Sequence, residues 1–211
     1  MIINGFTLDQ YSKRFIIAEI GMNHNGLYDN AIKLIDIAVE SGADSVKFQM
    51  RCLEELYSQD ALDVSKGDLS TQYTLGLLKK FELTFKEYKK LAQYCKDKKI
   101  LFLCTPWDIK SIDLIEKIGV PAYKVASADM TNYALLDHLC EKGKPIILST
   151  GMSKKEEIDN VVNYLKDKKN KVSFALLHCN STYPAPFKDI NLNYMEKLSE
   201  YNVPIGYSGH E

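Results

Sequence analysis

Lysine and hydroxyl side chains recur at the ends of short apolar segments in this sequence. Lys47 and Gln49 lie two positions apart in the segment Ser45–Gln49, so both face the same side if that segment is a strand. Lys124 and Ser127 end a second such segment. A buried ammonium is costly unless it meets an anion, so both lysines are candidate anion ligands. The hydroxyl donors that accompany them at other segment ends are Thr105, Ser127, Ser149 and Ser208.

This donor set predicts a compact ligand that carries phosphate and carboxylate, such as phosphoenolpyruvate. A structural explanation is also available, because lysines can extend to solvent from strand ends or pair with internal carboxylates. Glu19, at the end of another segment, can hold a water, act as a base or pair with one of the lysines. A Schiff-base aldolase would instead use Lys47 or Lys124 as its nucleophile.

Two histidines and the cysteines have more ordinary explanations. His210 follows Ser208-Gly209 and could ligate a divalent metal, although a hydrogen-bonding histidine at a loop start fits the same spacing. His178 ends an apolar run and is expected to be a satisfied core residue. The five cysteines show no CxxC pairing, which predicts reduced thiols in the interior.

Seven segments rich in Val, Ile, Leu and Phe are predicted strands, with helical stretches between most of them. They are Phe15–Ile20, Ser45–Gln49, Ile100–Thr105, Ala122–Ser127, Pro145–Thr150, Val172–His178 and Val203–Ser208. Such alternation predicts an α/β fold with a parallel sheet, either open and doubly wound or closed into a barrel. Polar side chains end all seven segments, which favours a TIM (β/α)8-type barrel, because nearly every strand of a barrel contributes to one mouth.

Local signals mark several helix ends. Asp29–Glu40 is a predicted helix followed by Gly42, and capping boxes are predicted at Thr84 with Glu87 and at Ser153 with Glu156. Asp108 is a predicted N-cap. Residues 51–80 are the least regular stretch and are expected to form an extended connection over the barrel mouth.

A complete barrel of this type needs eight strands and about 250 residues. Only seven strands are predicted within the 211 residues, so we expect the barrel to stop after its seventh strand. The sequence is then part of a longer polypeptide or is completed by a partner. Residues 1–211 are otherwise expected to form one globular domain.

Composition excludes some classes of protein. The formal net charge is −1, from 27 basic and 28 acidic residues without long blocks of one sign, which does not favour nucleic acid or an anionic membrane. No apolar run approaches the ~20 residues of a membrane span, and the N-terminus lacks the apolar core of a signal peptide. We therefore expect a soluble, cytoplasmic protein.

Seven blocks in order resemble the sialic acid synthase family, which includes N-acetylneuraminate, legionaminate and pseudaminate synthases and the spore-coat polysaccharide synthases. The resemblance covers nearly the whole chain. Its blocks are Phe15–Gly26, Gly42–Gln49, Thr105-Pro106, Pro121–Ser127, Pro145–Met152, Leu177–Pro186 and Gly206–His210.

The resemblance implies condensation of phosphoenolpyruvate with an N-acetylated amino sugar to give a nonulosonic acid and phosphate. C3 of phosphoenolpyruvate would attack the open-chain sugar aldehyde, which a divalent metal (Mn2+ or Mg2+) polarises. Water would then attack C2, and phosphate would leave by C–O cleavage. The implied phosphoenolpyruvate ligands are Lys47, Thr105, Lys124, Ser127, Ser149 and Ser208, the sugar ligands are Gln49, Asp129, Ser181 and Tyr183, the metal ligand is His210, and the catalytic acidic residue is Glu19.

The sequence departs from the family pattern in the sugar pocket. Asp129 stands where some members carry Glu, and Asn180-Ser181 where some carry Thr-Asn, so a different N-acylated hexosamine is expected. The second metal-binding histidine and the antifreeze-like domain that covers a partner's site in family dimers would lie beyond Glu211. Residues 1–211 alone are therefore expected to be inactive or severely impaired. The competing hypothesis is a non-catalytic barrel remnant that binds an anion or pairs with another subunit.

Overall fold

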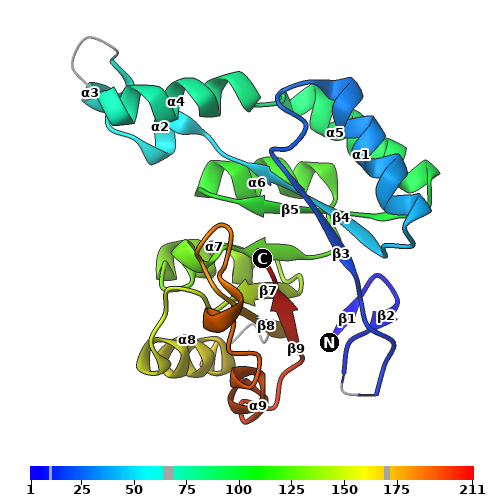
Figure 1. Ribbon diagram of the computed structural model, residues 1–211, viewed down its shortest axis with the longest axis vertical. Coiled ribbons are helices and arrows are strands. Elements are labelled where there is room, and N and C mark those ends of the chain that lie inside the picture. The colour runs from blue at the N-terminus through cyan, green and yellow to red at the C-terminus, as the bar shows by residue number, and fades with distance from the viewer. Residues whose placement is uncertain (10, 64–68, 169–171) are drawn as a thin grey trace. The chain divides into compact units, whose positions relative to one another are not determined.

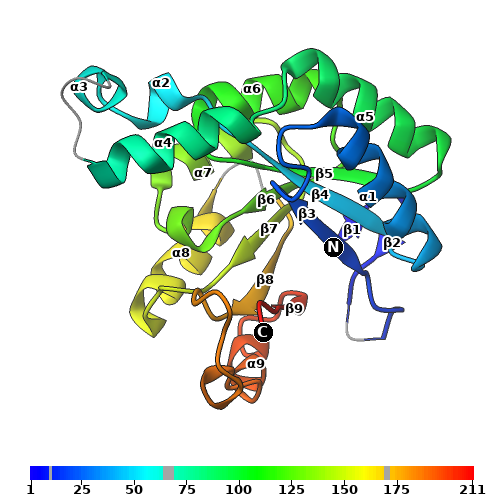
Figure 2. The ribbon, with the colours of Figure 1, turned by 45° about the horizontal axis from the view of Figure 1, so that its top comes forward.

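The computed structural model describes residues 1–9, 11–63, 69–168 and 172–211. The chain divides into two compact units. The first-half unit is Phe15–Val120, and the second-half unit joins Met1–Arg14 to Pro121–Glu211. Figure 1 labels most of the helices and strands of both units, and Figure 2 also labels β6.

The first-half unit is a parallel sheet with helices packed against it. Its strands pair in the order β3, β4, β5. Helices α1 and α5 lie side by side and pack against these strands, and α6 packs against α5 and β5 (Figure 2). The elements are β3 (Ile17–Gly21), α1 (Tyr28–Glu40), β4 (Ser45–Met50), α5 (Phe85–Asp97), β5 (Leu101–Pro106) and α6 (Ile109–Ile118).

An aromatic cluster forms the core on the helix side of this sheet. The fully buried Phe48 stacks on Phe102 with ring centroids 5.3 Å apart and meets Tyr88 of α5 edge-on at 6.2 Å. Side chains alternate along a strand, so Lys47 and Gln49 point to the other face. The packing of Phe48 thus fixes the direction of Lys47, the residue predicted to bind an anion.

Three of the predicted helix-end signals are confirmed in this unit. Thr84 Oγ1 accepts from the backbone N–H of Glu87 at 3.3 Å, while Glu87 Oε2 accepts from the N–H of Thr84 at 2.7 Å. Asp108 Oδ1 accepts from the N–H of Ser111 at 2.7 Å, at the start of α6. Gly42 follows α1 with φ 76°, a conformation that glycine adopts without steric cost.

Residues 51–80 lie between β4 and α5, as the predicted connection requires, but the expected irregularity was wrong where the structure describes them. Instead of an irregular connection, this stretch contains α2 (Leu53–Leu56), α3 (Gln59–Leu62) and most of α4 (Leu69–Phe81). Ser58 caps α3, since its Oγ accepts from the N–H of Ala61 at 3.3 Å. Residues 64–68 lie outside the described part of the chain.

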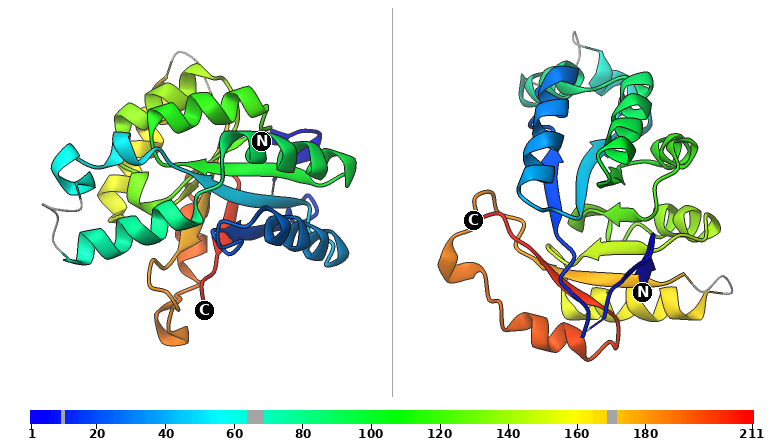
Figure 3. Two further views of the ribbon diagram at one scale, coloured as in Figure 1. Left: turned by 90° about the horizontal axis from the view of Figure 1, so that it is seen from above. Right: turned by 90° about the vertical axis from the view of Figure 1, so that its right-hand side faces the viewer.

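The second-half unit contains four parallel strands paired in the order β6, β7, β8, β9. Helix α9 packs against β8 and β9 (Figure 3). The elements are β6 (Tyr123–Val125), the 3-10 turn η1 (Ser127–Asp129), α7 (Tyr133–Glu141), β7 (Ile146–Ser149), α8 (Lys155–Asp167), β8 (Phe174–Cys179), the 3-10 turn η2 (Phe187–Asp189), α9 (Tyr194–Ser199) and β9 (Ile205–Ser208).

This unit also holds an antiparallel hairpin that the sequence analysis did not predict. Its strands, β1 (Ile2–Ile3) and β2 (Phe6–Thr7), are joined by Asn4 and Gly5, with φ 45° and 87°. An Asn-Gly pair with two positive φ values is the turn that favours a two-residue hairpin. The signal was therefore present in the sequence, although the strands are too short to show alternation.

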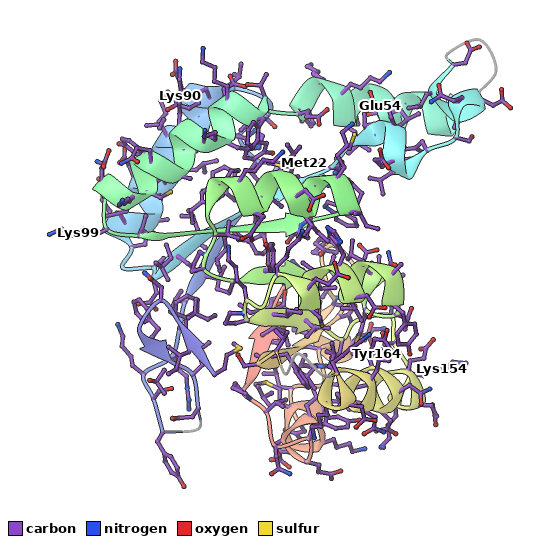
Figure 4. All side chains as sticks on the ribbon, turned by 180° about the vertical axis from the view of Figure 1, so that it is seen from behind. Met22, Glu54, Lys90, Lys99, Lys154 and Tyr164 are labelled. Atoms are coloured by element: carbon purple, nitrogen blue, oxygen red, sulfur yellow. The ribbon has the colours of Figure 1, made fainter. Side chains whose placement is uncertain are left out.

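The predicted capping box at Ser153 and Glu156 was wrong by one position. Helix α8 begins at Lys155, and the carboxylate that turns back is Glu157, whose Oε2 accepts from the N–H of Lys154 at 2.6 Å. Farther along this helix Tyr164 (Figure 4) donates its hydroxyl to Asp137 Oδ1 at 2.5 Å. This bond ties α8 to α7.

The cysteines are all free, and four of the five are buried, with Cys52 half-buried. The predicted interior position is therefore confirmed for four cysteines and is wrong for Cys52. Among the described residues, none of the helices combines the length and hydrophobicity needed to cross a bilayer.

His24 has a structural role in the loop after β3. The residue is 1% exposed, and its Nδ1 accepts from the N–H of Gly26 at 3.1 Å. The imidazole lies 5.9 Å from the Phe48 ring. Burial lowers the pKa of His24 from its usual 6.5, since desolvation disfavours the charged ring.

We therefore expect stability to fall with acidification. Because the folded pKa lies below the unfolded value of 6.5, the unfolded chain binds the proton first, and stability is lost as pH drops below that value. Protonation at Nδ1 also removes the acceptor for Gly26, at a cost of about 1 kcal/mol. Urea unfolding at pH 7.5 and 5 measures the loss. His24→Asn keeps an acceptor but does not titrate in this range. Its free energy of unfolding relative to that of the native protein should therefore be higher at pH 5 than at pH 7.5. The same difference in free energy at both pH values would contradict the assignment.

Candidate active site

The first-half unit brings Lys47, Glu19 and Thr105 together. The register of β3 and β4 places Glu19 opposite Lys47, and the two side chains form an ion pair. Lys47 Nζ also donates to Thr105 Oγ1 at 3.0 Å. The lysine side chain is 8% exposed and the glutamate side chain 40% exposed, so a buried cation lies beneath a carboxylate that reaches solvent.

This pairing matches one alternative that the sequence left open, a lysine held by an internal carboxylate. It does not exclude anion binding, because a partly hydrated carboxylate can be displaced or can act on a bound ligand. It does disfavour Lys47 as a Schiff-base nucleophile, since an ammonium engaged by a carboxylate and a hydroxyl has no free electron pair.

A bulge in β3 places Gln49 beside Glu19. The pairing of β3 with β4 shifts register between Glu19 and Gly21, and Gly21 has φ 54°. An ideal Cβ on Gly21 would lie 3.3 Å from Glu19 Oε1 and 3.4 Å from Gln49 Nε2. The missing side chain at this position thus leaves the carboxylate and the amide close to each other.

The second-half unit holds the other predicted lysine. Lys124 of β6 is 6% exposed, and its Nζ donates to the carbonyl of Val125 at 2.8 Å. Ser149, at the end of β7, is 2% exposed. Among the described residues, the buried hydroxyl oxygens of Ser149 and Ser181 have no hydrogen-bond partner. Buried hydroxyls without partners are uncommon unless a ligand or water completes them.

Gly151 is the residue around which the hydroxyls of this unit gather. A Cβ at this position would collide with Ser181 Oγ, would lie 2.7 Å from Ser127 Oγ, and would lie 3.2 Å from the carbonyl of Cys179. Residues following β6, β7 and β8 therefore meet at this glycine. Gly151 lies within the block Pro145–Met152, but its role depends on contacts that the sequence alone does not reveal.

His210 lies between two predicted ligands. Its Nε2 is 3.0 Å from the Tyr183 hydroxyl and 3.4 Å from Ser208 Oγ. The Tyr183 and His210 rings are 4.1 Å apart. No group of three or more His, Cys, Asp or Glu within the described ranges could hold a metal, so the residues present do not by themselves make up a metal site.

Two further predicted positions have structural contacts. Asp129 is half-buried at the end of η1, and its Oδ1 accepts from Asn132 Nδ2 at 3.2 Å. His178 is 8% exposed and its Nε2 donates to the carbonyl of Ile190 at 2.6 Å. The prediction of a satisfied core histidine is confirmed.

A pocket of about 480 Å3 lies elsewhere on the first-half unit, beside Arg51, Glu82 and Tyr88. None of its described lining residues is a predicted site residue. The predicted site residues therefore lie outside the lining of this pocket.

A family model described as the NeuB family matches residues 34–211, which include all the predicted site residues except Glu19. The chain belongs to the NeuB family. The resemblance to sialic acid synthases is thereby confirmed.

Named relatives of this NeuB-family chain include two synthases. It is 39% identical to the N,N'-diacetyllegionaminic acid synthase of Campylobacter jejuni over 94% of this chain and 61% of the relative. It is 34% identical to the human N-acetylneuraminate-9-phosphate synthase over 93% of this chain and 55% of the relative. The chain thus spans little more than half the length of these curated relatives.

A solved structure confirms the fold. The N-acetylneuraminic acid synthetase of Leptospira borgpetersenii, in complex with citrate, is 34% identical and matches all of this chain and 70% of its own with a TM-score of 0.89. The predicted α/β fold of the (β/α)8-barrel type is therefore confirmed, and the described chain contributes seven parallel strands to it.

Proposed function

We propose that this chain carries the phosphoenolpyruvate-binding residues of a sialic-acid-type synthase. The enzyme condenses phosphoenolpyruvate with an N-acylated amino sugar, similar to N-acetylmannosamine, to give a nonulosonic acid and phosphate. Family membership supports the reaction class, and the differing names of the relatives leave the sugar undetermined.

The observation that carries the proposal is a buried lysine in each unit. Lys47 and Lys124 are each 6% exposed, and each lies on a parallel strand that is followed by polar side chains. Lys47 already pairs with Glu19, whose partly exposed carboxylate a bound anion can displace. The family resemblance implies that both lysines bind phosphoenolpyruvate, with Thr105, Ser127, Ser149 and Ser208 as hydroxyl donors.

In the proposed reaction, C3 of phosphoenolpyruvate forms a bond to the aldehyde carbon of the sugar. The electron pair of the enol double bond makes the new bond, and the aldehyde oxygen takes up a proton. Water then adds at C2 and the C–O bond to phosphate breaks. The Glu19 carboxylate pairs with Lys47 and reaches solvent, so it can accept the proton that the water loses.

The sugar ligands remain a proposal from the resemblance: Gln49, Asp129, Ser181 and Tyr183. The family resemblance also implies Mn2+ or Mg2+, which when bound would supply electrophilic catalysis. His210 would provide one ligand. Because the residues that the structure describes do not complete a metal site, the roles of Lys47, Glu19 and the hydroxyls are assigned without the metal.

The test is phosphate release by the full-length gene product, with phosphoenolpyruvate, Mn2+ and a panel of N-acylated hexosamines. Release that needs both sugar and metal supports the synthase. Borohydride trapping with a keto acid distinguishes a Schiff-base aldolase from the synthase, because only the aldolase mechanism leaves a covalent adduct on lysine. If no phosphate is released under any of these conditions, the result favours a non-catalytic barrel remnant.

A further inference from the structure

Arg51 is a charged residue that the proposed reaction does not use. It follows β4 directly and is half-buried. Its guanidinium carbon lies 4.9 Å from the centroid of the Trp107 ring, and desolvation lowers its pKa. A partly desolvated guanidinium needs firm hydrogen bonds.

One such bond runs to Gln49, the proposed sugar ligand. Arg51 Nη2 donates to Gln49 Oε1 at 2.7 Å. Arginine has no acceptor, so the amide oxygen must face it and the amide nitrogen must face away. The orientation of the Gln49 amide is therefore fixed by the chemistry of its neighbour.

The main chain of Gln49 is held as well. The hydroxyl of Tyr88 donates to the carbonyl of Gln49 at 2.6 Å. The side-chain nitrogen is directed to the region of Gly21, where an ideal Cβ would lie 3.4 Å from it and 3.3 Å from Glu19 Oε1. The amide nitrogen and the carboxylate oxygen thus both border the space that a side chain at position 21 would fill.

We propose that Arg51 is a positioning residue that makes this subsite a hydrogen-bond donor toward the amino sugar. The inference rests on the proposed function. A subsite that presents N–H groups selects an acceptor on the sugar, a hydroxyl or N-acyl carbonyl oxygen, and discriminates against analogues that lack it. If Arg51 is removed, the amide can rotate and offer its oxygen instead.

Steady-state kinetics of the full-length protein test the proposal. Arg51→Met keeps an unbranched side chain against Trp107 but cannot donate, and we expect KM for the amino sugar to rise about tenfold, as for one misplaced hydrogen bond. KM for phosphoenolpyruvate should not change. Arg51→Lys can still donate and should recover most of the loss. Equal changes in both KM values would show a merely structural role and overturn the proposal.

A double-substitution cycle tests whether Arg51 acts through Gln49. Gln49→Leu removes the amide, so adding Arg51→Met to it should have no further effect on KM for the sugar. Additive effects of the two substitutions would overturn the inference.

An NMR readout separates this inference from the proposed function. The Gln49 side-chain NH2 signals, assigned by their loss in Gln49→Leu, should be dispersed in the native protein and averaged in Arg51→Met. Signals that are identical in both proteins overturn the positioning role, whatever reaction the protein catalyses. A native protein that forms no product with any amino sugar overturns the proposed function instead.

Discussion

Lys47→Met is expected to lower kcat/KM for phosphoenolpyruvate about 10³-fold, in the range found when a preorganised electrostatic group is removed. Methionine matches the length of the lysine stem and removes its charge. Lys47 is buried and engages both Glu19 and Thr105, so neither water nor a surface lysine can replace it.

Folding should largely survive this change. Breaking a fully buried ion pair costs about 3–5 kcal/mol because the remaining charge is left unpaired. Here the Glu19 side chain is 40% exposed and can be hydrated, which makes the cost smaller. Stopped assays at several phosphoenolpyruvate concentrations give kcat/KM, and circular dichroism gives the melting temperature.

Lys86→Met is the matched control. Lys86 is exposed on α5, so the same substitution should leave kcat/KM and the melting temperature near native values. Native kcat/KM in Lys47→Met would exclude this lysine from the proposed phosphoenolpyruvate ligands.

Gly151→Ala is expected to reduce kcat/KM about 10²-fold, comparable to the loss of one well-placed hydrogen-bond donor. The added methyl group would occupy space taken by the hydroxyls of Ser127 and Ser181, and both serine side chains would have to rotate. The φ of Gly151 is not in the left-handed range, so alanine suits the backbone conformation at this position, and the Cys179 carbonyl, 3.2 Å from the new Cβ, has to move only slightly.

Gly76→Ala provides the control for this second substitution. Nothing lies within 4 Å of an ideal Cβ on Gly76, and this residue is in α4, where alanine is favoured over glycine by about 1 kcal/mol. Its activity should stay at the native level. If Gly151→Ala also keeps native activity, the hydroxyls around Gly151 do not bind the substrate.

Local sequence patterns predicted most of the strands and several helix ends. Alternation and β-propensity depend on neighbouring residues, so segments such as Ser45–Gln49 and Pro145–Thr150 were recognised within one or two positions. The Thr84 capping box is equally local. Residues 51–80 were misjudged, because short helices such as α2 and α3 show too few turns for a periodic pattern.

The residue types at the strand ends also followed from sequence alone. Lys47 and Lys124 were identified because charged side chains within apolar runs need a reason to be buried. What the sequence could not determine was their partners. The choice between an ion pair with Glu19 and exposure to solvent depends on strand register, which joins segments distant along the chain.

Only the tertiary structure decided the positions of Gly151 and Arg51. Gly151 matters because the hydroxyls of Ser127 and Ser181 converge on it. Arg51 matters because its hydrogen bond to Oε1 fixes the orientation of the Gln49 amide. Glycine carries no side-chain chemistry, and an arginine after a strand is usually a surface residue. The sequence thus determined which side chains are available at the strand ends. Strand register and loop packing determined which of these side chains meet, because contacts across parallel strands are not encoded by spacing along the chain.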